Sequence, residues 1–331
     1  MKFKTASKLQ RWGVFFFIGW VGAAFGGDAP ALPQRNLSSK PKPYTHAPDL
    51  ANMAYGPHER NVMDVWKAKS DKPTPIVVNF HGGGFNHGDK SMISPLLVEY
   101  CLGKGLTVAT VNYRLSTQAI YPAQLEDSAR AVQFIRYHAK EWNVNPKALA
   151  VTGGSAGGVI SMWLGFREDM ADPASADPVK HESTRPTVTG PIDGQSSLDM
   201  REIVKMLGET WTREAGTYPA SFLFGLQAGE DLLTAKRLFP VYEEASPINH
   251  LKAGAVPTYM YYANPPGPIP PRNHDDALHN FHFGMLVKER MDKLGLECEL
   301  HHSGEYGGKG GLPALRDMVT FFEKHFPKET K

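Results

Sequence analysis

The feature that most constrains the fold is a glycine-flanked serine in the motif VTGGSAGG at residues 151–158. An apolar strand is predicted just before it, at residues 148–152, and a helix just after it, at residues 156–166. A serine at such a sharp turn adopts a strained backbone conformation that projects its hydroxyl above the sheet. The flanking glycines leave room where strand and helix would otherwise collide. The pattern therefore predicts that Ser155 is an accessible nucleophile.

A second glycine-rich segment, HGGGF at residues 81–85, follows the predicted strand PIVVNF at residues 75–80. Consecutive glycines let backbone N–H groups approach a substrate without obstruction from side chains. Two such amides, together with the N–H of Ala156, can stabilise the anion of a tetrahedral acyl intermediate. A phosphate-binding loop would need a lysine after the last glycine of the serine motif, where Val159 stands. The two segments together favour acyl chemistry.

Short apolar strands alternate with amphipathic helices from Asn61 onward, which is typical of a mostly parallel central sheet flanked by helices. We expect one single α/β domain. Strands are predicted at residues 61–66, 75–80, 106–113, 148–152, 187–188, 256–263 and 297–302. Helices are predicted at residues 91–102, 122–138, 156–166, 198–207, 281–294 and 312–325.

In these motifs the sequence resembles the α/β-hydrolase superfamily, in its HGGG-type esterase and lipase branch. Hormone-sensitive-lipase-like carboxylesterases and acetylxylan or feruloyl esterases look most similar. The resemblance covers residues 61–166, with NVMDVW, NFHGGGFNHGDK, VNYRLS, YPAQLEDSARAVQFIR and VTGGSAGG in the family's order. It implies the α/β-hydrolase fold, Ser155 as nucleophile, and the amides of Gly83, Gly84 and Ala156 as the oxyanion hole. Phe85 stands where the family often has tryptophan.

The acid and the histidine depart from the family's pattern. The acid normally follows the strand predicted at 256–263, but residues 264–271 read NPPGPIPP, and no carboxylate occurs before Asp275 and Asp276. The histidine normally follows the last strand. That segment reads SGEYGGKGG at residues 303–311, and Gly308 aligns with the histidine's position.

Two hypotheses stay open for the proton relay. In the first, shifted residues restore it: His302 or His301 is the base, and Asp275 or Asp276 orients it. Our candidate set is Ser155, His302 and Asp275, and it requires the imidazole to come within ~3 Å of the serine. In the second, the relay is lost and the fold retains only an acyl-binding cleft, as a binding protein or a slow hydrolase.

The remaining histidines have simpler interpretations. His274, His279 and His282 lie in a segment rich in Pro and Asp, which we interpret as a solvated loop. A metal site formed by these three with Asp275 is the alternative, because imidazoles at these spacings could converge. We predict neither a metal nor a cofactor. His81 is interpreted as a hydrogen-bonding residue beneath the glycine loop.

Charge and cysteine content exclude several classes of protein. The chain has 36 Lys and Arg against 34 Asp and Glu, a formal net charge of +2. It lacks the one-sided basic field that binding of nucleic acid requires. Cys101 and Cys298 are far apart and lie in apolar segments, which indicates two buried thiols rather than a disulfide framework or a zinc site.

The N-terminus has the pattern of a signal peptide. Four basic residues within the first eleven precede an apolar run at 12–24 and small residues up to Ala29. The run is shorter than the ~20 residues that span a bilayer, although a retained anchor is the alternative. We therefore expect a signal peptide at 1–29, a linker at 30–50, and an α/β-hydrolase domain at 51–331 with a cap-like excursion at 170–220. The protein would be secreted or periplasmic.

These observations predict a secreted serine carboxylic ester hydrolase that acts through an acyl-enzyme. Its substrate would be a small-molecule or carbohydrate ester. We expect no cofactor, no nucleic acid partner and no stable membrane span after processing; the sequence does not determine the oligomeric state. The alternative is a catalytically impaired relative that binds rather than cleaves, and a peptidase comes third.

Overall fold

The structure is a computed structural model that describes residues 46–308 and 311–328. The predicted signal peptide and most of the predicted linker lie outside these residues. In the described part of the chain, no helix has the length and apolar character needed to cross a membrane.

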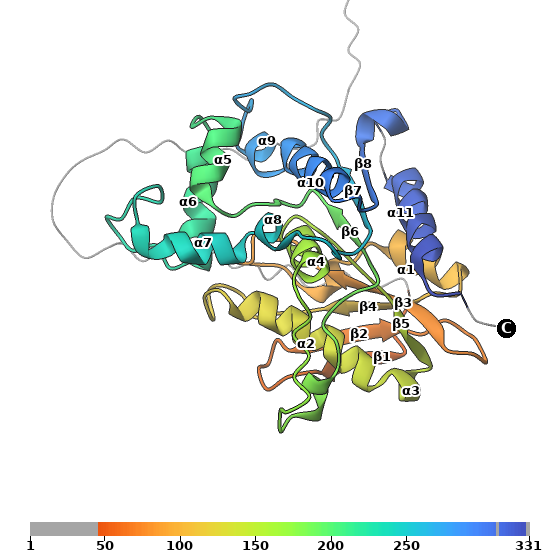
Figure 1. Cartoon of the computed structure of the whole chain (residues 1–331). Coiled ribbons are helices and arrows are strands. Elements are labelled where there is room, and N and C mark those ends of the chain that lie inside the picture. The colour runs from red at the N-terminus through yellow and green to blue at the C-terminus, as the bar shows by residue number, and fades with distance from the viewer. Residues whose placement is uncertain (1–45, 309–310, 329–331) are drawn as a thin grey trace, which may run out of the picture. The chain divides into compact units, whose positions relative to one another are not determined.

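One eight-stranded sheet organises the domain (Figure 1). Its order is β1-β2-β4-β3-β5-β6-β7-β8; β1 and β2 pair antiparallel, as do β2 and β4, and the other pairs are parallel. The strands are β1 (Leu50–Ala54), β2 (Val62–Trp66), β3 (Thr74–Phe80), β4 (Thr107–Val111), β5 (Val144–Gly154), β6 (Val188–Ile192), β7 (Thr258–Tyr262) and β8 (Cys298–His302).

Helices cover both faces of the sheet (Figure 1). Helices α1 and α11 pack on one face, and α2 and α4 pack on the other. The helices are α1 (Pro95–Gly103), α2 (Ala123–Tyr137), α3 (Ala139–Trp142), α4 (Ala156–Phe166), α5 (Met200–Leu207), α6 (Thr212–Leu223), α7 (Phe239–Ala245), α8 (Pro247–His250), α9 (His274–Leu278), α10 (His282–Lys293) and α11 (Gly311–His325).

Alternation along β3 shows how the sheet builds two cores. Ile76, Val78 and Phe80 point into the cluster under α2 and α4, whereas Val77 points into the cluster under α1 and α11. Successive side chains of a strand face opposite sides of the sheet, so a strand buried on both faces is apolar throughout. This explains the unbroken hydrophobicity of PIVVNF. The mostly parallel sheet with flanking helices confirms the predicted α/β-hydrolase fold.

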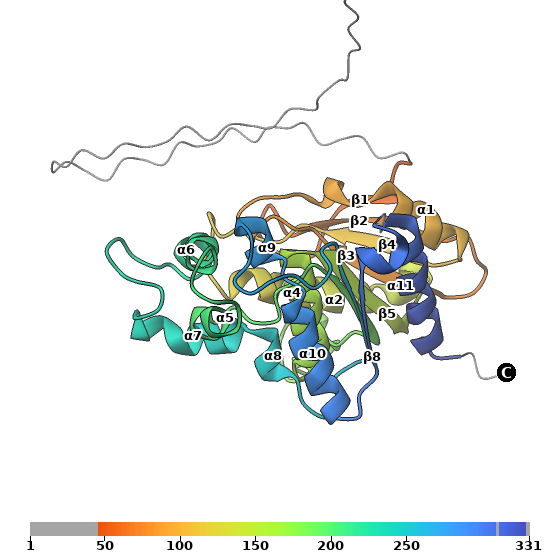
Figure 2. The same cartoon turned by 90° about the horizontal axis from the view of Figure 1, so that it is seen from above.

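The chain between β6 and β7 leaves the sheet and carries α5 to α8. Figure 2 shows α5, α6 and α7 gathered at one end of the sheet, with α9 between them and the strands. Helices α6 and α9 are in contact. Sequence reasoning found α5 but missed α6 to α9, and it missed β1, whose first residue, Leu50, falls within the predicted linker. Cys101 and Cys298 are free and buried, as predicted.

Candidate active site

Ser155 occupies the turn between β5 and α4. Its backbone has φ 53° and ψ −114°, a left-handed conformation that is strained for a residue with a side chain. Its N–H donates to the carbonyl of Ile192 at the end of β6, at 2.8 Å. The motif's glycines are required sterically: a Cβ on Gly157 would lie 2.0 Å from the carbonyl oxygen of Phe80. The local structure is therefore the one that the serine motif predicted.

The glycine loop lies directly against this turn. A Cβ on Gly82 would lie 2.9 Å from the Gly154 carbonyl oxygen and 3.6 Å from the Ser155 Cβ. The next two residues, Gly83 and Gly84, have φ values of 109° and 56°, which side chains rarely tolerate. Ala156 is the first residue of α4, so its N–H has no partner within the helix. The predicted oxyanion donors thus lie on the two segments that meet at Ser155.

A buried hydrogen-bond chain holds the glycine loop in place. His81 Nδ1 lies 2.8 Å from the Gly82 carbonyl oxygen, and Arg60 lies 3.2 Å from His81 Nε2. A carbonyl oxygen can only accept a hydrogen bond and a guanidinium can only donate one, so His81 Nδ1 donates and Nε2 accepts. Burial lowers the pKa of His81 to about 4, even though the hydrogen bond to Gly82 raises it. Arg60 also donates to the carbonyls of Gly88 and Tyr113. His81 is thus a neutral structural residue, as the sequence suggested.

The hydrogen-bond partner of Ser155 is His279. His279 Nε2 lies 3.1 Å from Ser155 Oγ, and its Nδ1 lies 3.0 Å from an Asp275 carboxylate oxygen. Helix α9 brings the two partners together, because residues four apart lie on one face of a helical turn. Asn273 caps this turn by accepting from the N–H of Asp276. The chain thus contains a Ser–His–Asp arrangement built from two segments.

The hydrogen-bond partners also fix the tautomer of His279. A carboxylate can only accept, so Nδ1 carries the proton that it shares with Asp275. In the neutral ring, Nε2 then has a free lone pair and can accept the hydroxyl proton of Ser155. The imidazole is one-quarter exposed, whereas the Asp275 side chain is 73% exposed. The arrangement can therefore remove a proton from the serine, with the acid at the surface.

The prediction of His302 as the base was wrong, because the histidine that contacts Ser155 is His279. Instead of meeting Ser155, the His302 ring accepts the N–H of Gly304 at 3.1 Å and packs edge-on against Phe281. It acts as the N-terminal cap of the short 3₁₀ turn Ser303–Tyr306, and the Glu305 carboxylate accepts the His302 N–H in return. The Asp275 carboxylate does meet a histidine, but it is His279 rather than His302.

Asp276 and His301, the second candidates for the acid and the base, also have structural roles. Asp276 is buried and accepts from Arg272, which closes the loop before α9. His301 is held between the carboxylates of Glu299 and Glu305. Burial lowers the pKa of His301, but its hydrogen bonds to these two carboxylates offset this, and the pKa is raised overall.

The histidine-rich segment does not converge on a metal centre. His279 faces Ser155, and His282 pairs with Asn280 at 2.8 Å. Across residues 46–308 and 311–328, no group of three or more His, Cys, Asp or Glu side chains is arranged to hold a metal ion. The signal that reveals His279 in the sequence is local: Asn273 can cap a helical turn in which Asp275 and His279 are four apart. The interpretation of that segment as a solvated loop misses this turn.

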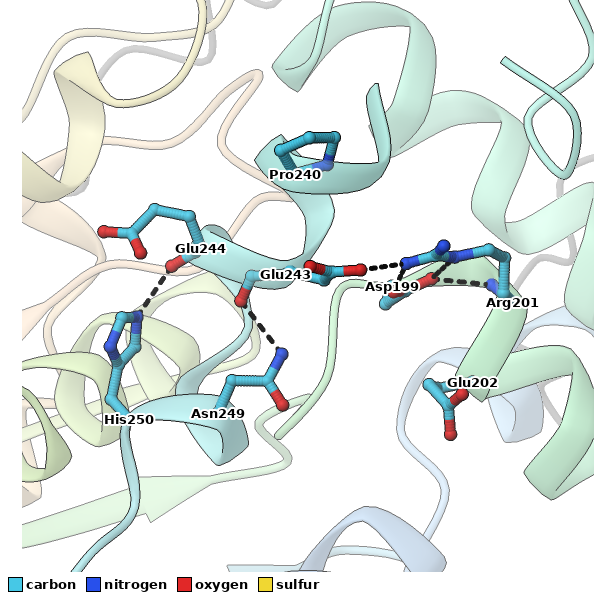
Figure 3. A pocket seen from close by; sticks show the side chains of 8 residues that line it. All are labelled: Asp199, Arg201, Glu202, Pro240, Glu243, Glu244, Asn249 and His250. Carbon is cyan, nitrogen blue, oxygen red and sulfur yellow. Dashed lines mark hydrogen bonds and ion pairs between the residues drawn. The ribbon is translucent and has the colours of Figure 1, made fainter. Parts of the chain in front are cut away.

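A cavity of about 700 Å³ lies elsewhere, between α5 and the α7–α8 segment (Figure 3). Its polar groups bind one another: Arg201 bridges the carboxylates of Asp199 and Glu243, and Asn249 donates to the Glu243 carbonyl (Figure 3). Arg201 also stacks on the Phe239 ring at 4.0 Å. These contacts hold α5 against α7, so the residues that line the cavity have a structural role and are separate from the serine site.

Residues 63–276, well over half of the chain, match the BD-FAE family model. The match begins in β2 and ends in α9, so it includes the glycine loop, the serine turn and Asp275. The chain belongs to the BD-FAE family. This confirms the resemblance to the HGGG-type esterase branch of the α/β hydrolases.

Named relatives of this BD-FAE chain are esterases of Mycobacterium tuberculosis. The probable carboxylic ester hydrolase LipM is 24% identical over 254 residues, which cover 76% of this chain and 55% of LipM. The carboxylesterase NlhH is 38% identical over 87 residues, 26% of this chain and 27% of NlhH. The chain therefore spans about half or less of the length of these relatives.

Solved structures share the fold of the BD-FAE chain. The acetyl ester-xyloside bifunctional hydrolase of Caldicellulosiruptor lactoaceticus is 22% identical with a TM-score of 0.61, covering 80% of this chain and 87% of that one. A truncated carbohydrate esterase from gut microbiota is 19% identical with a TM-score of 0.65, covering 84% and 96%. Esterase 2 of Thermogutta terrifontis, in a form phosphonylated by sarin, is 20% identical with a TM-score of 0.63, covering 86% and 98%.

Proposed function

We propose that this protein is a serine carboxylic ester hydrolase that acts through an acyl-enzyme, with His279 as its base. The observation that carries the proposal is the 3.1 Å contact between His279 Nε2 and Ser155 Oγ, with Asp275 on the other ring nitrogen. This geometry is the requirement for activating a serine hydroxyl, which is a weak nucleophile on its own. The family relationship to named esterases supports the same reaction.

Acylation begins when Ser155 Oγ attacks the ester carbonyl carbon and His279 Nε2 takes the hydroxyl proton. Asp275 accepts from Nδ1 throughout, so it orients the ring and stabilises the imidazolium without taking the proton itself. The imidazolium then gives its proton to the leaving alcohol as the carbon–oxygen bond breaks. The acyl group remains on Ser155 as an ester.

The oxyanion that forms during the attack would accept hydrogen bonds from the amides of Gly83, Gly84 and Ala156. Helix α4 starts at Ala156, and the positive end of its dipole adds to this stabilisation. The buried chain from Arg60 through His81 to Gly82 keeps the loop fixed before substrate arrives, so no reorganisation is needed during the reaction. Each donor is typically worth about 3 kcal/mol of barrier.

Deacylation reverses the roles. His279 Nε2 takes a proton from water, the resulting nucleophile attacks the acyl carbon, and Ser155 leaves with the proton from the imidazolium. A base in contact with the serine favours this function over that of a catalytically impaired binding protein, which would lack one.

We further propose export of the protein and esters carried by polysaccharides as its substrates. The basic and apolar N-terminal sequence supports export. The substrate class is supported by solved neighbours described as an acetyl ester-xyloside hydrolase and a carbohydrate esterase. Small activated esters should react as well, because the serine attacks the acyl carbon and an activated alcohol leaves easily.

A fluorophosphonate probe and p-nitrophenyl acetate test the proposal. Wild-type protein should be labelled on the peptide containing Ser155 and should release p-nitrophenol with a burst of about one equivalent per chain. Ser155→Ala should abolish both signals. Ser303→Ala, which removes the hydroxyl that donates to the Ala263 carbonyl, is the matched control and should behave as wild type. Folded wild-type protein that is unlabelled and no faster than Ser155→Ala would contradict the proposed function.

A further inference from the structure

A second cavity, of about 710 Å³, lies between α2, the loop that joins β1 to β2, and the segment that joins α4 to β6. Its lining includes Asn61 from the loop, Arg130 and Gln133 from α2, and Lys180 from the 3₁₀ turn Pro178–His181, which contacts α2. None of its described lining residues belongs to the serine turn, the glycine loop or α9. Its volume lies within the range of small-molecule sites, about 300–1,000 Å³.

Two ion pairs fix the walls of this cavity. Arg114 binds the buried Asp127 carboxylate through Nε at 2.8 Å and through Nη2 at 2.7 Å. Arg130 pairs with Asp177 at 2.5 Å and donates to the Tyr55 carbonyl at 2.7 Å, so it ties α2 to both of the other walls. The three walls are therefore fixed relative to one another before a ligand binds, and such preorganisation lowers the cost of binding.

The charge of the lining favours a neutral ligand. Three basic side chains, including Lys180, and four carboxylates, including Asp127, line the cavity. This balance leaves no excess of positive charge to attract phosphate or another anion. No metal-binding group of three or more His, Cys, Asp or Glu side chains occurs in the described part of the chain. Among the described lining residues the apolar side chains are those of Pro57, Ala129 and Met170, so the ligand must be largely polar.

The buried side chain of Gln133 presents an acceptor that has no partner. The residue is 4% exposed, and its amide nitrogen donates to the carbonyls of Lys180 at 3.2 Å and Glu182 at 2.8 Å. These two bonds fix the orientation of the amide, because a carbonyl oxygen can only accept. No group within residues 46–308 and 311–328 donates to the amide oxygen Oε1. Gln133 lines the cavity, so a donor bound there can satisfy this oxygen, and a buried acceptor without a donor is costly.

Other lining residues present donors. His58 Nδ1 accepts the N–H of Arg60 at 3.1 Å, so the neutral ring carries its proton on Nε2 and can donate it to a ligand. Lys180 is exposed and, among the described residues, has no ion-pair partner, so its ammonium is a second donor. The cavity thus offers donors and an acceptor together. A hydroxyl group both donates and accepts, so a ligand with many hydroxyl groups matches this set.

We infer that this cavity is a second binding site, which takes a neutral saccharide and is separate from the site of ester cleavage. The inference rests on the proposed function, because the saccharide would be part of the polysaccharide that carries the ester. A chain held at two sites brings its esters to Ser155 at a higher effective concentration. A polymeric substrate therefore gains affinity from the cavity, whereas a small ester does not.

Methionine-methyl NMR of Ser155→Ala protein tests the inference without turnover. The methyl resonance of Met170, which lines the cavity, should shift saturably with at least one of xylotetraose, cellotetraose and mannotetraose. Met285, which is exposed on α10, is the internal control and should not shift. Gln133→Ala and Lys180→Ala should each weaken binding by about fivefold, which is the loss of one hydrogen bond. Lys180→Ala keeps the carbonyl that Gln133 binds, so it remains informative if Gln133→Ala does not fold.

Lys288→Ala is the matched control, since it removes a lysine that pairs with Asp292 on α10 and should leave binding unchanged. A Met170 resonance that none of the three oligosaccharides moves at up to about 10 mM would overturn the inference. Equal affinities in folded Lys180→Ala and Lys288→Ala would do so as well, as would tighter binding of inorganic phosphate, which would indicate an anion site. These outcomes do not depend on ester hydrolysis. Loss of labelling and turnover in wild-type protein would instead count against the proposed function.

Discussion

Replacement of the two histidines, one at a time, distinguishes the base found in the structure from the base predicted from the sequence. His279→Ala removes the group 3.1 Å from Ser155 Oγ and leaves the serine, the oxyanion amides and the helix dipole intact. Loss of a base of this kind costs about 10⁶-fold in kcat, which corresponds to about 8 kcal/mol of transition-state stabilisation. The variant should retain a residual rate about 10³-fold above that of water, from the oxyanion hole and binding.

His302→Ala is the matched control, because it removes an imidazole at the end of β8. There the ring caps a short turn, and its loss should cost about 1 kcal/mol of folding stability and less than about twofold in kcat. The assay is initial-rate hydrolysis of p-nitrophenyl acetate at pH 8, with melting temperatures measured in parallel.

The double variant Ser155→Ala with His279→Ala makes the comparison stricter. Residues that act as one unit give losses that do not add, so the double variant should be no slower than Ser155→Ala alone. The reasoning is refuted if His279→Ala keeps more than a tenth of the wild-type kcat. It is equally refuted if His302→Ala loses as much activity as Ser155→Ala while remaining folded.

Two further predictions concern the framework of the site. Gly157→Ala should lose about 3 kcal/mol of folding stability or more, together with most of the activity, because its Cβ would lie 2.0 Å from the Phe80 carbonyl oxygen. Gly154→Ala has open space around its Cβ and should melt near the wild-type temperature. Equal melting temperatures for the two variants would disprove this. Burial lowers the pKa of His81 to about 4. The protein should therefore lose about 3 kcal/mol of folding stability as the pH falls from about 6.5 to about 4, because only the unfolded chain binds a proton at this histidine in that range. Urea unfolding between pH 7 and pH 4 should therefore show a shallower decline for His81→Asn, and parallel declines would contradict the assignment.

The serine turn and the glycine loop could be predicted because their physics is local. A strained turn between a strand and a helix needs glycines beside Ser155, and close approach of amides needs glycines after His81. Both requirements fall on neighbouring residues and can be recognised in the sequence. The same holds for the alternation of strands and helices, which predicted the fold class and most of the sheet strands.

The histidine could not be predicted in that way, although Asp275 was among the candidates for the acid. His279 is 124 residues from Ser155, and a histidine can act from any loop that reaches the carboxyl edge of the sheet. Analogy placed the base after β8, where His302 caps a turn instead. The fold brings α9 back over the serine, so that His279 reaches Ser155 Oγ. The sequence by itself therefore determined the nucleophile and the glycine loop beside it, because these depend on backbone conformation within a few residues. Only the tertiary structure decided the proton relay, because that depends on which distant side chains come within about 3 Å of one oxygen atom.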